Sequence, residues 1–164
     1  MPAVNSVRPT FSKRLIVRSL IGSGDRIMLS TLPFVAVALV IQVVDPSRFA
    51  IDGSTALRSI AAAVLAVGLV AWAWSVALIV TRVPRGELIT SGPYAVMTHP
   101  LYTSVGLLVL PAAGVLLGTW LGLLVGAGVY AGSRVFAPAE EEALATTFGP
   151  AWDDYRRHVL VPWI

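Results

Sequence analysis

Long apolar segments separated by short polar ones occupy most of this chain, and their lengths predict helices that cross a lipid bilayer. Residues 27–44 and 60–80 are almost wholly apolar and contain no charged side chain. At a rise of ~1.5 Å per residue, each segment is about long enough to cross a hydrocarbon core ~30 Å thick. Asp45-Pro46 ends the first segment, because a proline interrupts helical hydrogen bonding. The first half of the chain therefore contains two predicted membrane spans.

A third apolar segment covers residues 101–136, and its 36 residues are too many for one span but suit two. We predict spans at about 101–117 and 119–136, joined as a tight helical hairpin near Gly118-Thr119. Glycines recur here at every fourth position, which places them on one helical face and lets a neighbouring backbone approach closely. The alternative is that glycine is simply common in membrane helices. These glycines are Gly114, Gly118, Gly122 and Gly126.

The polar parts of the chain are a basic segment at residues 1–26, a loop at 82–100 and a tail at 137–164. Residues 27–164 are expected to form a single membrane domain, since no other stretch is large enough for a second core. Residues 11–21 mix basic and apolar side chains, which fits either an interfacial helix or an ordinary charged flank of the first span. No small-residue cleavage pattern follows the first apolar segment, so we expect a retained anchor rather than a removable signal peptide.

Positive charge is distributed unevenly about the predicted spans. With four spans, ten of the 12 Lys and Arg residues fall on the side of the N-terminus, and only Arg48 and Arg58 fall on the other. The positive-inside rule then places both termini, the loop and the tail in the cytoplasm. The expected location is an integral membrane position, which in a bacterium is the inner membrane.

Composition excludes several classes of function. Hydrophobic residues make up 56% of the chain and charged ones 13%, with a mean hydropathy of +0.78, so a separate soluble catalytic domain is excluded. The basic residues form no aromatic-interleaved patch, so we expect no nucleic-acid partner. There is no cysteine, which rules out disulfides and thiolate chemistry. His99 and His158 stand far apart without helical pairing, and no metal site is expected.

The first polar cluster that offers chemistry lies in the loop and extends from Gly86 to Tyr102. Proline is favoured at the first position of a helix and constrains the residue before it, so His99-Pro100 is expected to start the third span. The His99 ring would then lie where backbone N–H groups favour an anion such as a carboxylate. The alternative is that this pair only marks the start of a helix at the membrane interface.

The second polar cluster lies in the tail and begins with Glu140, Glu141 and Glu142. Acidic side chains so close to a span are unfavourable unless they face water, a cation or a cationic ligand. A solvated helix start is the plainer alternative. The apolar residues that follow are spaced as one stripe of a tail helix, interrupted or restarted at Gly149-Pro150, and are expected to pack on the membrane core. This stripe comprises Leu144, Phe148, Trp152 and Tyr155.

Taken together, the two clusters resemble the signature of the isoprenylcysteine carboxyl methyltransferase and phospholipid methyltransferase superfamily of membrane enzymes. The resemblance covers roughly residues 86–163. Its order and spacing agree with the family pattern, although two positions depart from it. Thr98 stands where the family usually has Arg. The family also has an arginine shortly before the Glu pair, which is absent here, and Arg134 is the nearest basic residue. The matching elements are Gly92-Pro93-Tyr94, Thr98-His99-Pro100-Leu101-Tyr102, Glu140-Glu141-Glu142-Ala143-Leu144, Phe148-Gly149 and Tyr155.

The resemblance implies S-adenosylmethionine as methyl donor and a lipidic or amphipathic small molecule, within the membrane lipids, as acceptor. It implies an all-α integral membrane fold of about four transmembrane helices, in which the C-terminal hairpin and a cytosolic tail helix cover a cofactor pocket. Carboxyl O-methylation of an isoprenoid acid and N-methylation of a phospholipid are both open, and a non-catalytic membrane scaffold or assembly protein is the alternative. The implied catalytic residues are Glu140, Glu141 and Arg134, and the implied cofactor-binding residues are Tyr94, His99, Pro100, Tyr102, Glu140, Glu141 and Tyr155.

Overall fold

The computed structural model describes the backbone of residues 13–161 and the side chains of residues 26–161. Within this part the chain is helical, and three helices are long and apolar enough to cross a membrane. The prediction of a helical membrane protein is confirmed at this level. The three long helices are α1 (Lys13–Val44), α2 (Thr55–Arg82) and α6 (Leu121–Phe148).

Helix α1 is continuous from Lys13 into the membrane-spanning stretch Arg26–Val44. The basic segment 13–21 therefore belongs to the same helix as the span, whereas residues 1–12 lie outside the described part. The helix ends at Val44, as Asp45-Pro46 predicted. The Asp45 carboxylate then accepts hydrogen bonds from the Ser47 hydroxyl and the Arg48 N–H, which begins a turn rather than another helical residue.

Helix α2 begins five residues before the predicted span because Ser54 caps it. The Ser54 hydroxyl accepts a hydrogen bond from the Leu57 N–H at 3.2 Å, which satisfies one of the unpaired donors at a helix start. At the other end the helix continues to Arg82 and into the short 3₁₀ helix η1 (Val83–Arg85).

Where the third span was predicted, the structure has a shorter and less regular apolar helix. The stretch Pro100–Leu116 consists of α4 (Pro100–Thr103), a π-helical segment η2 (Ser104–Val109) and α5 (Leu110–Leu116). Pro111 has no N–H to donate to the preceding turn, and just before it the Leu110 N–H reaches back to the Val105 carbonyl. At ~1.5 Å per residue this stretch measures only about 25 Å, so it is shorter than the other three.

Where the fourth span was predicted, at 119–136, the structure has a helix that starts close to the predicted position and continues well beyond residue 136. Helix α6 begins at Leu121 and continues past Pro138 to Phe148, so it includes Glu140, Glu141 and Glu142. The first residues of the predicted tail, from 137 on, are therefore part of helix α6. Pro138 has no N–H and so removes one hydrogen bond of the helix, yet the residues on both sides of it are helical. The three glutamates thus lie on the same continuous helix as the fourth predicted span.

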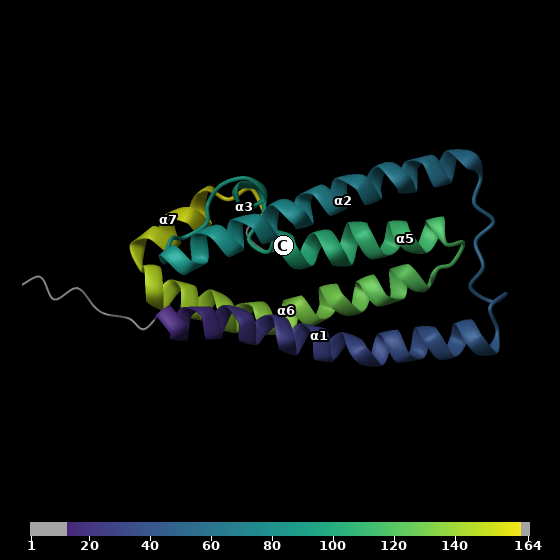
Figure 1. Cartoon of the computed structure of the whole chain (residues 1–164), viewed down its shortest axis with the longest axis horizontal. Helices are drawn as coiled ribbons and strands as arrows, with labels where there is room; N and C mark the ends of the chain where they lie inside the picture. The colour runs from purple at the N-terminus through teal and green to yellow at the C-terminus, as the bar shows by residue number, and fades with distance from the viewer. Residues whose placement is uncertain (1–12, 162–164) are drawn as a thin grey trace, which may run out of the picture.

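The helices lie side by side in the order α2, α5, α6 and α1 (Figure 1), with α1 packed along α6 and α5 packed between α6 and α2. One end of this layer carries residues 83–99 and α7 (Pro150–His158) and is called the tail end here. The opposite end, the turn end, holds residues 45–54 and the hairpin turn 117–120. There the Ile51 N–H donates to the Gly118 carbonyl and the Trp120 N–H to the Phe49 carbonyl.

Close packing of the hairpin is confirmed, but its glycines do not share one helical face. Gly118 lies in the turn, so the stripe is divided between the two arms. Gly114 on α5 faces Gly122 on α6, and Gly106 on η2 faces Gly126 on α6. A methyl group at Gly122 would lie 2.7 Å from the Gly114 Cα, which is too close for two carbon atoms. The four-residue spacing of the glycines brings the backbones of the two hairpin arms together because the chain reverses at Gly118, in the middle of the series.

Candidate functional site

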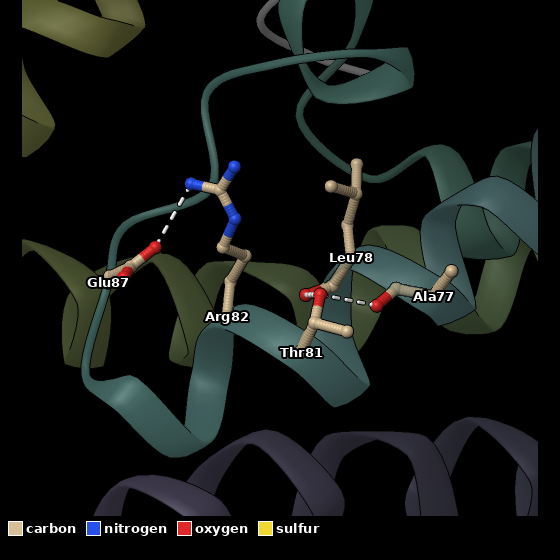
Figure 2. Close-up of polar contacts among 5 residues, drawn as sticks. All are labelled: Ala77, Leu78, Thr81, Arg82 and Glu87. Carbon is tan, nitrogen blue, oxygen red and sulfur yellow. Dashed lines mark hydrogen bonds and ion pairs between the residues drawn. The ribbon is translucent and has the colours of Figure 1, made fainter.

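The loop that follows α2 turns back on itself at the tail end. Arg82, the last residue of α2, donates from Nη1 to Glu87 Oε2 at 3.0 Å, as Figure 2 shows. In the same turn the Thr81 hydroxyl donates to the Ala77 carbonyl at 2.7 Å. Both partners of the ion pair are exposed, so it adds at most about 1 kcal/mol. Its effect is to direct the chain back along α2.

The loop then lies against α2 rather than beyond its end. A Cβ at Gly92 would be 2.9 Å from the Trp74 ring, and Gly92 has a φ of 63°, a value that favours glycine. Trp74 stands two turns before the end of α2. The short helix α3 (Pro93–Val96) therefore lies beside α2 rather than beyond its last turn (Figure 1). Tyr94 therefore reaches the depth at which α4 begins.

His99 is the residue before α4, and Pro100 is the first residue of that helix, as predicted. The His99 side chain does not cap the helix. Its Nε2 lies 3.1 Å from Oε1 of Glu141 on α6, and only 9% of the His99 side chain is exposed. The expected carboxylate partner of this ring is therefore one of the protein's own side chains. This contact joins the two polar clusters across 42 residues of sequence.

The second oxygen of Glu141 is also engaged. Arg156 on α7 donates from Nη1 to Glu141 Oε2 at 2.7 Å. The Glu141 side chain is 18% exposed and that of Arg156 is 41% exposed. One carboxylate thus connects the start of α4, the extension of α6 and the tail helix, and charge-assisted hydrogen bonds are the strong members of their class.

The tail helix α7 is held over the loop by its apolar face and two hydrogen bonds. Trp152, Tyr155 and Val159 are buried together against partly buried residues that include Leu88. The Tyr155 hydroxyl donates to the Tyr94 carbonyl at 2.8 Å, and the Val161 N–H donates to the Val96 carbonyl at 2.9 Å. The predicted apolar stripe is therefore divided between α6 and α7, and it packs on itself and on the loop rather than on the membrane core.

Burial changes the acid–base behaviour of two tyrosines in this region. Burial, with a smaller contribution from Glu141, raises the pKa of Tyr155 to about 12. Burial also raises the pKa of Tyr94, and Glu140, Tyr102 and Tyr155 add to the effect. Removing a phenol from water disfavours its charged form. Both phenols are therefore neutral at physiological pH and can donate hydrogen bonds.

The structure gathers the predicted site residues at the tail end of the bundle. Pro100 is fully buried beside His99, and the Tyr102 ring centre is 6.5 Å from that of His99. Glu140 is close enough to act electrostatically on Tyr94. Arg134 is exposed on α6, two helical turns before Glu141, and its charge acts on that carboxylate. The gathered residues are Tyr94, His99, Pro100, Tyr102, Arg134, Glu140, Glu141 and Tyr155.

Sequence reasoning did not assign Arg156 or Thr98 to the site. Arg156 is one of several basic residues in the tail, and only the turn at Gly149-Pro150 brings it back to Glu141. Thr98 was noticed only as a departure from the family pattern. It is 5% exposed, and its hydroxyl has no hydrogen-bond partner in the part of the chain that the structure describes. A buried, unpaired polar group in a native fold calls for an explanation.

Among the described residues, no group of three or more His, Asp or Glu side chains is placed to hold a metal ion. Comparisons with models of protein families, with curated proteins and with solved structures return no match. The functional assignment consequently rests on the residues themselves.

Proposed function

We propose that this protein is an S-adenosylmethionine-dependent methyltransferase of the membrane, which acts on a lipidic or amphipathic small molecule. The observation that carries the proposal is the contact of His99 with Glu141 at 3.1 Å. It joins the two clusters whose sequence resembles the isoprenylcysteine and phospholipid methyltransferase superfamily. The aromatic residues of that resemblance, Tyr94, Tyr102 and Tyr155, surround the same point.

The side chains at this point suit the groups of the methyl donor. Its ammonium and ribose hydroxyls favour carboxylates, for which Glu140 and Glu141 are the candidates. Its carboxylate favours a hydrogen-bond donor, for which the His99 ring nitrogen that does not contact Glu141 is the candidate, and its sulfonium favours the face of an aromatic ring. The unpaired, buried Thr98 hydroxyl offers one further hydrogen bond to a bound molecule. Pro100 contributes a fixed, apolar wall beside His99.

A bound donor would supply a methyl group on a positively charged sulfur: the acceptor would bond to the methyl carbon in line as the carbon–sulfur bond breaks, and S-adenosylhomocysteine would leave. The protein's own residues then have to orient the two reactants, exclude water and balance charge. Tyr155 is a buried wall and Tyr94 a half-buried one, and the Tyr155 hydroxyl is fixed by its hydrogen bond to the Tyr94 backbone carbonyl. Glu140 and Glu141 provide negative charge on a rigid helix. Arg134 lies on α6 nearer the membrane than Glu141, where it would meet an anionic group of an acceptor that arrives from the bilayer.

We also propose four membrane crossings and a tail end that faces the cytosol. The hairpin arm Pro100–Leu116 is close to a crossing length, and a short helix is accommodated by local thinning of the bilayer. The excess of Lys and Arg on the side of the tail supports this orientation. The methyl donor would then reach the site from the compartment in which it is made, and the acceptor from the membrane. Labelling of single cysteines placed at Ser47 and Ser91 tests the orientation, since the chain has no cysteine of its own.

Calorimetric titration of the detergent-purified protein with S-adenosylmethionine tests the proposal. We expect heat of binding in the wild-type protein and in Glu142→Gln, an exposed neighbour on the same helix. Glu141→Gln should bind the donor at least tenfold more weakly, because a partly buried charged hydrogen bond contributes about 1.5–3 kcal/mol. No heat in the wild-type protein at millimolar donor contradicts the proposal.

A second experiment separates enzymatic activity from a scaffold or assembly role. Replacing Glu140 and Glu141 together by Ala should abolish a cellular phenotype that depends on methyl transfer and should leave a purely structural role intact. Labelled donor added to membranes, followed by identification of the labelled lipid, distinguishes carboxyl O-methylation from amine N-methylation.

A further inference from the structure

Arg156 is the feature of the site that the proposed function leaves unexplained. Both oxygens of Glu141 are engaged within the protein, Oε1 by His99 and Oε2 by Arg156. A carboxylate in this state offers a cationic ligand no oxygen without a competing partner. Each carboxylate oxygen can accept a second hydrogen bond, so such a ligand either shares an oxygen with its present partner or takes that partner's place.

The two contacts differ in how easily they are exchanged. The His99 ring is 9% exposed and stands at the start of α4, fixed by the buried Pro100. The Arg156 guanidinium is 41% exposed, on a long side chain of the tail helix. Water and salt reach the Arg156 end of its pair and screen the charge there, and holding this long side chain in one position costs conformational freedom. Arg156 is therefore the partner that exchanges.

The tail helix itself is joined to α6 by a single residue, Gly149. Gly149 ends α6 and precedes α7 with a φ of 52°, and a Cβ at this position would meet nothing within 4 Å. The residue is thus required for the chain reversal and not for packing. Beyond it, the Trp152 cluster, the Tyr155 hydroxyl and the Val161 N–H hold the tail against the loop. The Arg156 ion pair holds α7 against α6.

We propose that Arg156 is an exchangeable counter-ion of Glu141, which holds the tail helix closed and yields its place to the ammonium group of the methyl donor. The inference rests on the proposed function and assigns Arg156 a positioning role. It acts through Glu141 and is not a catalytic residue. Arg156 also makes Glu141 selective, because an uncharged molecule of similar shape cannot replace a guanidinium there.

The first test measures the tail without any ligand. Hydrogen exchange of the Val159 and Val161 amides reports opening of α7, since the Val161 N–H donates to the Val96 carbonyl. Arg156→Gln should speed this exchange about two- to fivefold, the effect expected on losing one exposed ion pair. The matched control is Arg157→Gln, which removes the neighbouring, more exposed pair with Asp154 and should leave the exchange unchanged. Equal exchange in the two variants overturns the proposal that Arg156 holds the tail helix closed.

The second test measures ligand affinity by calorimetry with S-adenosylhomocysteine, the demethylated form of the donor, and with its analogue lacking the amino group. Arg156→Gln should bind S-adenosylhomocysteine about two- to fivefold more tightly than the wild-type protein, because a competing cation is gone. Its affinity for the analogue should be unchanged, and Arg156→Lys should restore wild-type behaviour. Weaker or unchanged binding of S-adenosylhomocysteine to Arg156→Gln overturns the exchange and identifies Arg156 as a structural or ligand-binding residue.

The two proposals fail in different ways. If the wild-type protein binds neither ligand, the proposed function is wrong, and the exchange with a donor falls with it. Hydrogen exchange then decides alone whether Arg156 holds the tail helix closed. If the wild-type protein binds both ligands but Arg156→Gln shows neither faster exchange nor tighter binding, the inference is wrong and the proposed function stands.

Discussion

The hairpin between α5 and α6 gives a quantitative prediction for Gly122→Ala. A Cβ at Gly122 lies 2.7 Å from the Gly114 Cα and also contacts the Leu110 carbonyl oxygen. Carbon atoms pack best at about 3.5–4.0 Å, so the two helices have to separate by roughly 1 Å. The obstructing atoms belong to the backbone and cannot rotate away. The whole arm must move.

The expected cost follows from two opposing effects. Overpacking of a tight interior costs about 1–3 kcal/mol, and two backbone clashes favour the upper part of that range. Alanine is a better helix former than glycine by about 1 kcal/mol, which offsets part of the cost. We therefore expect Gly122→Ala to lower the free energy of unfolding by about 1–2 kcal/mol.

Reversible unfolding in mixed micelles of mild detergent and dodecyl sulfate, followed by circular dichroism, measures this difference. Gly53→Ala is the matched control, because its Cβ would meet only the flexible Arg58 side chain at 3.4 Å. The control should stay within about 0.5 kcal/mol of wild type. Wild-type stability of Gly122→Ala, or equal destabilisation by both substitutions, would refute the packing of this hairpin.

Two further predictions concern Tyr155. Tyr155→Phe removes its hydrogen bond to the Tyr94 carbonyl and should lower the free energy of unfolding by about 0.5–1.5 kcal/mol, measured in the same micelles; no loss would contradict the bond. Because the folded pKa of Tyr155 is about 12 against an ordinary value of 10.0, folding favours the protonated phenol. Its contribution to stability is complete below about pH 10 and is lost as the pH rises toward 12. Tyr155→Phe should flatten this alkaline decline, and absorbance of tyrosinate should show Tyr155 ionising late; ionisation near pH 10 would contradict its burial.

Features set by local rules could be predicted from the sequence. Asp45-Pro46 ends α1, His99-Pro100 starts α4, and the hairpin turns close to Gly118-Thr119. In each case the backbone geometry of one or two residues decides the result. The apolar lengths likewise predicted the long helices, since only helices satisfy every backbone group within a bilayer.

Features set by distant contacts could not be predicted in the same way. Pro138 was expected to lie beyond a span that ended near residue 136, but α6 passes through it, although an internal proline removes one helical hydrogen bond and crowds the preceding turn. The pairing of Glu141 with His99 and Arg156 depends on the reversal at Gly149 and on the return of the loop along α2. Motif order suggested that the clusters meet, whereas the particular atoms that touch required the fold.

Methyl transfer itself tests the central claim most directly. Membranes that contain the protein are incubated with S-adenosylmethionine labelled in the methyl group, and the label in the organic extract is counted. We predict label with the wild-type protein and with Glu142→Gln, and a loss of at least tenfold with Glu141→Gln, as expected for one partly buried charged interaction. Equal label from all three proteins and from membranes without the protein would contradict the account.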